Sequence, residues 1–221
     1  MPSFSSDSSC WIVKLLKLCF SDAQGLKFDV VVSNFDEDLD KSTFTGGAEY
    51  ASATATHKAM EVATRLEKEK PAPFVVIGAD TVVEGPDGAI LEKPKDADEA
   101  MKMLLSLQGI THQVHTGVGV IFPNNGGGGE RLVKTFSETT KVTFAPLGEA
   151  EIAAYIKTGE PFDKAGGYGA RGGFYSSTHL SFIKTHRAEG FLRTLRASLT
   201  CPRLAFRSFV SQGSKVPREL S

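Results

Sequence analysis

The segment FVVIGADTVV, residues 74–83, places a carboxylate within a run that otherwise suits the interior of a protein. Its first five residues are almost wholly apolar, a pattern typical of a buried strand. The sequence GPDG at 85–88 has strong turn chemistry, so we expect the chain to return as a second strand over 89–92 and then to reach Lys93. The sequence therefore predicts a hairpin, with Asp80 at the carboxyl end of its buried strand.

Strands and helices alternate along the sequence around this hairpin. Short β-rich runs predict strands, and apolar residues at helical spacing predict helices. The strands are expected over residues 28–33, 111–122 and 134–144, and the helices over 46–70, 97–107 and 149–157. Pro71 ends the first helix, and Asp96 is placed to cap the second. This alternation, with hairpins between some strands, predicts an α/β fold with a mixed sheet covered by helices.

The totals favour one globular domain. A chain of 221 residues, 41% of them hydrophobic and 23% charged, is long enough for one substantial core. No apolar segment reaches the roughly eighteen residues of a membrane span. Lys14 and Lys17 interrupt the best candidate for a signal segment, so we expect a cytoplasmic protein that does not engage a membrane. The three widely spread cysteines lack the spacing of a disulfide framework or a zinc site.

The charges are divided unevenly between the two parts of the chain. Residues 171–221 hold nine Lys/Arg and two Asp/Glu, a charge of +7, whereas residues 1–170 carry −8. The periodicity of strands and helices is lost beyond Gly173, apart from a possible basic helix at 191–199. This tail leaves one functional alternative open, a basic segment that binds RNA or membrane surfaces. Its spread-out arginines favour only weak binding, so a nucleic-acid partner is not expected.

Two sets of residues suggest chemistry on phosphates. Ligand crevices in open α/β sheets form at the carboxyl ends of strands, where Asp80 is expected. A second acidic cluster, which includes Asp36 and Glu37, follows the strand at 28–33. Three lysines stand outside charge runs: Lys58, Lys93 and Lys164. Carboxylates hold hard cations and lysines hold phosphates. A helix cap or turn for Asp80, and a solvated loop for the acidic cluster, are the alternatives.

The segment TGEPFDKAGGYG, residues 158–169, is the other unusual stretch. Asp163 and Lys164 stand directly before three small residues, which let backbone amides approach a ligand closely. The alternative is a glycine-rich turn with a surface ion pair. His112 and His115 lie three apart on an expected strand and so face opposite sides, which excludes a local paired metal site. We interpret both histidines as structural.

Several segments in order resemble the Maf family of nucleoside triphosphate pyrophosphatases. They are IGADTVV (77–83), LEKP (91–94), LSLQGITHQVHTGVGV (105–120), FSETTKVTF (136–144) and EPFDKAGGYG (160–169). The resemblance covers residues 25–173 and implies one α/β domain with a nucleotide-binding cleft, similar to inosine triphosphate pyrophosphatases and often dimeric. It implies hydrolysis of dTTP, UTP or modified pyrimidine nucleotides to the monophosphate and pyrophosphate, with Mg²⁺ or Mn²⁺.

The resemblance also implies roles for individual residues. Asp80 would be the general base that activates water and would also touch the metal, and Thr81 would help to select the base or sugar. The lysines expected to hold the phosphates are Lys58, Lys93 and Lys164. Asp36 or Glu37 would share in metal binding.

Two departures from the family pattern affect the substrate contacts. The family's first strand ends in Ser-x-Ser-Pro-Arg-Arg, whereas the segment before Gly25 offers only Lys17 at that place, and lysine lacks the two-pronged geometry of arginine. Where the family has Ile-Gln after the glycine segment, this chain has Ala170 and Arg171, and we expect Arg171 to contact the substrate. Residues 1–24 and 174–221 are therefore expected to be atypical ends. The activity is expected to be weak or lost, with nucleotide binding without catalysis as the alternative.

Overall fold

A computed structural model of the chain describes residues 10–13, 28–69, 75–122, 131–169 and 183–186. The strands are β1 (Cys10–Val13), β2 (Phe28–Val31), β3 (Val75–Glu84), β4 (Ile90–Leu91), β5 (Thr111–Ile121), β6 (Val133–Phe144) and β7 (Ile183–His186). The helices are α2 (Gly47–Glu69), α3 (Ala97–Leu107) and α4 (Glu149–Ile156), with 3₁₀ turns η2 (Lys41–Thr43), η3 (Glu160–Asp163) and η4 (Ala165–Gly167). In the described residues no helix is long and apolar enough to cross a membrane.

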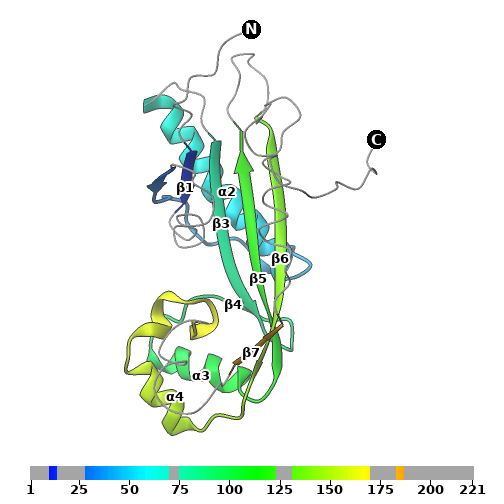
Figure 1. Ribbon diagram of the computed structural model, residues 1–221, viewed down its shortest axis with the longest axis vertical. Helices are drawn as coiled ribbons and strands as arrows, with labels where there is room; N and C mark the ends of the chain where they lie inside the picture. Colours follow the sequence, from blue (N-terminus) through cyan, green and yellow to red (C-terminus); the bar gives the residue numbers. More distant parts are fainter. Residues whose placement is uncertain (1–9, 14–27, 70–74, 123–130, 170–182, 187–221) are drawn as a thin grey trace, which may run out of the picture. The chain divides into compact units, whose positions relative to one another are not determined.

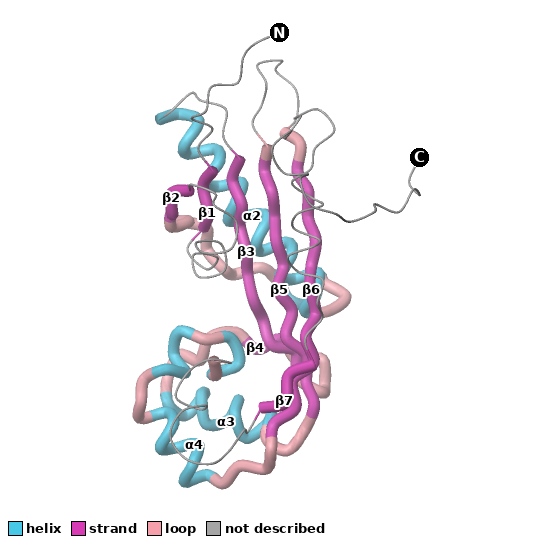
Figure 2. The backbone as a smooth tube through the Cα atoms, in the orientation of Figure 1, coloured by secondary structure: helices cyan, strands magenta, loops and turns pink. Residues whose placement is uncertain are grey.

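The strands form one mixed sheet in the order β2-β1-β3-β5-β6-β7, with β4 paired to β3 (Figures 1 and 2). β1 is parallel to both β2 and β3, while the remaining pairs are antiparallel. Three long antiparallel strands, β3, β5 and β6, make up most of the sheet. The expected α/β fold with a mixed sheet and flanking helices is confirmed.

The helices cover different parts of these long strands. α2 packs along β3 and β5 (Figure 1), where Val62 and Leu66 meet Val76 and Ile121. The cluster around α3 and α4 contains Val83 of β3 instead. Because successive residues of a strand point to opposite faces, even-numbered Val76 and odd-numbered Val83 take part in cores on opposite faces of the sheet.

Glycines let α2 lie almost directly on the backbone of the sheet. A Cβ at Gly78 of β3 would stand 2.3 Å from the carbonyl oxygen of Ala55, and one at Gly117 of β5 would stand 2.2 Å from the carbonyl carbon of Ala51. No side chain fits into either space. The facing residues of α2 are themselves small, so helix and strands approach each other with only backbone and methyl groups between them.

The hairpin prediction needs one correction. The turn forms as expected, since the Gly85 amide donates to the carbonyl of Ala89 at 2.9 Å. Asp80, however, is the sixth residue of the ten-residue strand β3 and does not lie at its end. The β-branched residues of TVV continue the strand, and β5 pairs with it along this whole stretch, with Gly117 opposite Asp80.

Two strands were not predicted from the sequence. β1 lies between β2 and β3, and β7 pairs with the end of β6 from Lys141 to Phe144. Each has only four residues, too few to show a period of two, and β7 lies in the basic tail, where we expected no strand. The rest of that tail, including the possible helix at 191–199, lies outside the described residues.

The glycine contact can be tested by adding one methyl group. We expect Gly117→Ala to lower the free energy of unfolding by about 2 kcal/mol or more, because overpacking against backbone atoms cannot be relieved by a rotamer change. Urea denaturation followed by circular dichroism measures the loss. Gly148→Ala is the control, since its Cβ would lie 3.5 Å from the flexible Glu151 carboxylate and the change should cost less than about 1 kcal/mol. Equal losses in the two variants would contradict the close helix–sheet contact.

Candidate active site

Asp80 and Lys58 form a buried ion pair between the sheet and α2. The Lys58 Nζ lies 2.8 Å from Asp80 Oδ1 and 2.8 Å from Glu37 Oε2. Asp80 is 7% exposed and Lys58 is 9% exposed, whereas the side chain of Glu37 is 41% exposed. One ammonium group is therefore shared by an inner carboxylate and by a second carboxylate at the solvent edge.

The backbone contact of α2 with the sheet accounts for this geometry. Asp80 projects to the same face of β3 as Gly78, because the two residues are two positions apart. Lys58 follows three positions after Ala55, which covers Gly78, so its side chain lies on the neighbouring part of the helix surface. The close approach of the two elements leaves the lysine within hydrogen-bond distance of the aspartate.

Glu37 is brought to the pair by the loop that follows β2. Ser33 Oγ and the Asn34 amide both donate to Glu61 of α2 at 2.9 Å. The ring of Phe35 stacks on His57, with 5.2 Å between centroids and 8° between planes. A hollow of about 490 Å³ lies beside this stack, but none of the three side chains of the ion-pair cluster is among the residues that line it. These contacts attach the loop to α2 immediately before Glu37.

The charges in this cluster oppose one another. Burial raises the pKa of Asp80, the Lys58 ammonium lowers it, and the carboxylates of Glu37 and Glu92 raise it further, so that it lies above its ordinary value. Burial alone lowers the pKa of Lys58, but Asp80 and Glu37 outweigh this effect and raise it. Lys58 therefore stays protonated, and Asp80 is a more basic carboxylate than a solvated one. A general base gains from this change, because its proton affinity moves toward neutral pH.

Glu92 organises a second group of contacts next to the ion pair. Its Oε1 accepts from the Tyr50 hydroxyl at 2.6 Å, and its Oε2 lies 2.8 Å from Lys41 Nζ. Burial raises the pKa of Tyr50, and the bond to Glu92 adds to the effect. Burial by itself raises the pKa of Glu92, but its bonds to Lys41 and Tyr50 outweigh this and lower it. Glu92 is therefore ionised while Tyr50 keeps its proton.

The glycine-rich loop, residues 158–169, is attached to Glu92 through its backbone. The Gly166 amide donates to the carbonyl of Glu92 at 2.9 Å. Gly166 has φ 67° and Gly167 has φ 75°, the left-handed region that other residues rarely adopt. Lys164, two residues before Gly166, pairs with Asp163 at 2.6 Å and its side chain is 39% exposed.

The end of this loop is held by buried aromatic side chains. His112 Nε2 and the Tyr168 hydroxyl are 2.6 Å apart, and the Gly169 amide donates to the Tyr155 hydroxyl at 3.3 Å. Phe144 packs edge-on against both His112 and Tyr168. Burial lowers the pKa of His112 to about 4, so the imidazole is neutral at physiological pH. His115 lies on the opposite face of β5, where its Nδ1 is 2.9 Å from Thr139 Oγ1. Both histidines therefore make structural contacts, as we expected.

The structure brings only some of the predicted residues together. Asp80, Lys58 and Glu37 meet, and the Gly166 amide, two residues after Lys164, is bonded to the carbonyl of Glu92. Lys93 is exposed and, within the described segments, makes no ion pair. Thr81 lies on the opposite face of β3 from Asp80, with its hydroxyl 3.0 Å from that of Thr116. Arg171 lies outside the described residues, as does Lys17.

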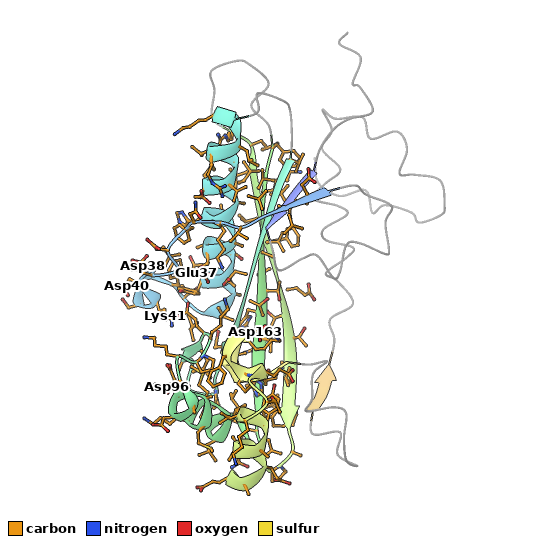
Figure 3. All side chains as sticks on the ribbon, turned by 90° about the vertical axis from the view of Figure 1, so that its left-hand side faces the viewer. Glu37, Asp38, Asp40, Lys41, Asp96 and Asp163 are labelled. Atoms are coloured by element: carbon orange, nitrogen blue, oxygen red, sulfur yellow. The ribbon has the colours of Figure 1, made fainter. Side chains whose placement is uncertain are left out.

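The acidic segment divides into residues with different roles. Glu37, Asp38, Asp40 and Lys41 are neighbours on one side of α2 (Figure 3). Asp40 accepts from the Ser42 amide at 2.9 Å and from the Ser42 hydroxyl at 2.7 Å, and so caps η2. This role is structural and agrees with the solvated loop that we gave as the alternative for the acidic cluster. Asp36 is exposed. Only Glu37 reaches the buried pair.

Sequence reasoning missed Tyr50, Lys41 and Glu92. Tyr50 is a lone aromatic residue among the small residues of α2, a sign that it fills a particular position. Glu92 was part of the motif LEKP, but only its neighbouring lysine was assigned a role. Lys41 directly follows the acidic segment and was assigned no role.

The described residues of this site offer few side chains that could coordinate a divalent cation. Among the described residues no group of three His, Cys, Asp or Glu side chains is placed to hold a metal ion. Glu37 and Asp80 do converge on one cation, the Lys58 ammonium. Mg²⁺ is often held by one or two carboxylates together with substrate phosphates. The pair therefore fits an ion that arrives with a polyphosphate.

Comparison with known proteins identifies the family. The family model described as "Maf-like protein" matches residues 18–181. The chain belongs to the Maf family, which confirms the resemblance seen in the sequence.

Named relatives agree with this assignment. The chain is 47% identical over 164 residues to the human "Probable bifunctional dTTP/UTP pyrophosphatase/methyltransferase protein", a match that covers 72% of this chain and 26% of the relative. It is 43% identical over 146 residues to the "dTTP/UTP pyrophosphatase" of Clostridium beijerinckii, covering 66% of this chain and 71% of the relative. The chain thus spans about a quarter of the human protein's length.

A solved structure of a dITP/XTP pyrophosphatase from Mycobacterium abscessus aligns with 63% of this chain and 75% of its own chain. The TM-score is 0.33 and the identity is 14%. At this distance the likeness supports no inference about the site.

The buried ion pair predicts a strong coupling between two substitutions. We expect Lys58→Met to lower the free energy of unfolding at pH 7 by about 3 kcal/mol, because it leaves the Asp80 charge buried without its partner. In an Asp80→Asn background the same change should cost less than about 1 kcal/mol. Urea denaturation of the native chain, both single variants and the double variant gives the coupling. Equal costs in the two backgrounds would show that the pair does not interact as described.

His112 predicts a specific dependence of stability on pH. Its pKa is about 4 in the folded chain and about 6.5 when unfolded, so the unfolded chain takes up the proton first. The contribution to stability is complete above pH 6.5 and is lost as the pH falls toward 4. Between pH 7 and pH 4 the native chain should lose on the order of 3 kcal/mol more than His112→Asn, which cannot titrate. Parallel losses, measured by urea denaturation at both pH values, would disprove the assignment.

Proposed function

We propose that the chain hydrolyses nucleoside triphosphates to the monophosphate and pyrophosphate. The observation that carries this proposal is the buried Lys58 ammonium shared by Asp80 and Glu37. Such an arrangement offers a basic carboxylate, a fixed cation and a second carboxylate at one place on the sheet. The names of the relatives favour dTTP or UTP as substrates, and we include modified pyrimidine nucleotides in the proposal.

Asp80 is the proposed general base. Lys58 occupies Oδ1, which leaves Oδ2 to accept a hydrogen bond from water. As the water oxygen bonds to the α-phosphorus, its proton passes to Asp80. The bond from the α-phosphorus to the bridging oxygen breaks, and its electron pair leaves with the pyrophosphate. β3 holds the acid in the middle of a paired strand, so the direction of attack is fixed before the substrate arrives.

The cations of the site stabilise the charge that develops on the phosphate oxygens. A preorganised ammonium group does this better than water, which must reorient. Lys58 lies next to the base, and Lys93 and Lys164 are proposed to hold the outer phosphates. Glu37 and Asp80 are the proposed protein ligands of Mg²⁺ or Mn²⁺, which when bound would neutralise phosphate charge.

Other parts of the sequence-based hypothesis stay predictions. They include the homodimer, the cytoplasmic location and the contact of Arg171 with the nucleotide. Thr81 faces away from Asp80, so an effect of this residue on base or sugar selection would act from the other face of β3. The weak activity expected without the family's arginine pair is also a prediction.

Pyrophosphate release across a panel of nucleoside triphosphates with magnesium chloride tests the proposal. We expect release with dTTP or UTP, and we expect Asp80→Asn to lower kcat at least a hundredfold because the general base is lost. Asp98→Asn is the matched control, since this exposed aspartate of α3 lies outside the site. A kcat of Asp80→Asn within twofold of the native value would remove Asp80 from this role. Nucleotide that raises Tm without any pyrophosphate release would show binding without catalysis.

A further inference from the structure

Glu92 connects three separate segments of the chain. Its carboxylate accepts from Tyr50 of α2 at 2.6 Å and pairs with Lys41 of η2 at 2.8 Å. Its backbone carbonyl accepts from Gly166 of the glycine-rich loop at 2.9 Å. The segments are far apart in sequence, and each supplies or adjoins a residue of the candidate active site.

Both oxygens of the Glu92 carboxylate are occupied by protein groups. The Tyr50 partner is 1% exposed, so its hydroxyl has little access to water and depends on Glu92. Lys41 also donates to the carbonyl of Ile90 at 3.4 Å and lies 5.9 Å from the centre of the Tyr50 ring. A carboxylate bound in this way is suited to hold other residues in place and less suited to be a ligand itself.

Two lysines depend on this connection through the backbone. Lys93 directly follows Glu92, so the direction of its Cα–Cβ bond is set where Glu92 is held. Lys164 stands two residues before Gly166, whose amide is bonded to the Glu92 carbonyl. The two lysines come from different loops: Glu92 immediately precedes one of them, and its carbonyl is bonded to the backbone two residues after the other.

We propose that Glu92 is a positioning residue that sets Lys93 and Lys164 relative to each other, so that both meet the same polyphosphate. The inference rests on the proposed function, because it assumes that these lysines bind phosphates. A polyphosphate spans only a few bonds, and small displacements of positioned groups cause large losses of binding and rate.

The test compares three variants in the full chain with magnesium chloride present. Glu92→Ala removes both side-chain bonds, while Glu92→Gln keeps an oxygen for Tyr50 and loses the charge opposite Lys41. Glu67→Ala is the control, because Glu67 also pairs with a cation, Arg131, and its side chain is 40% exposed compared with 34% for Glu92. The measurements are binding of inorganic pyrophosphate by calorimetry, Tm, and hydrogen exchange of peptides covering 160–169.

We expect Glu92→Ala to weaken pyrophosphate binding at least tenfold and to speed exchange at 160–169 at least tenfold. Glu92→Gln should lie between Glu92→Ala and the native chain in both measurements. The control should change neither quantity more than twofold. Unchanged binding or exchange in Glu92→Ala would overturn the inference, and so would a loss of Tm far beyond the control without partial rescue by glutamine.

A fourth variant, Tyr50→Phe, keeps the inference testable if Glu92→Ala does not fold. Tyr50→Phe removes one hydroxyl and keeps the ring in the core. Weakening of pyrophosphate binding by threefold or more would support the inference, and a smaller change would overturn it. Pyrophosphate binding and hydrogen exchange need no turnover, so a chain that fails to hydrolyse nucleotides would refute the proposed function and still report on Glu92.

Discussion

The contact between the backbones of α2 and the sheet sets the geometry of the site. Gly78 and Gly117 leave no room for a side chain, and the facing positions of the helix carry only small residues. The helix therefore has one allowed height above β3. At that height Lys58 reaches Asp80. Larger side chains between α2 and the sheet would move the lysine away from the aspartate. The packing of glycines and small helix residues thus determines the distance between the buried charges of Lys58 and Asp80.

The cluster is organised from the inside outward. Asp80 and Lys58 are buried and compensate each other, while Glu37 meets the same ammonium from the solvent edge. Glu92 provides a third carboxylate nearby, but its oxygens are bound to protein groups. The negative charges are therefore not equivalent. Asp80 is the acid to which the proposed function assigns chemistry, whereas Glu37 is paired with Lys58, and Glu92 with Lys41 and Tyr50.

The sequence predicted the long elements, because their signals are local, and it singled out Asp80, Lys58 and Glu37, which lie together in the structure. Turn residues at 85–88 and helical periodicity in α2 depend on neighbours in the chain. β1 and β7 are too short to show periodicity in the sequence. They are strands because they pair with other segments, β1 with β2 and β3, and β7 with β6. The place of Asp80 within β3 was misjudged, because the apolar run ends before the strand does. Tyr50 and Glu92 were missed for a similar reason: their bond joins residues 42 positions apart.

The position of Asp80 within a continuous strand has a consequence for how the site accommodates substrates of different size. A residue with paired backbone before and after it cannot follow a ligand, so the acid behaves as a fixed reference point. In the proposed function, adjustment comes from the long, rotatable side chains of Lys93 and Lys164, which are proposed to hold the phosphates. Under the proposed function, nucleotides that differ in the base share one site of bond cleavage, while the selection among them is decided by other residues.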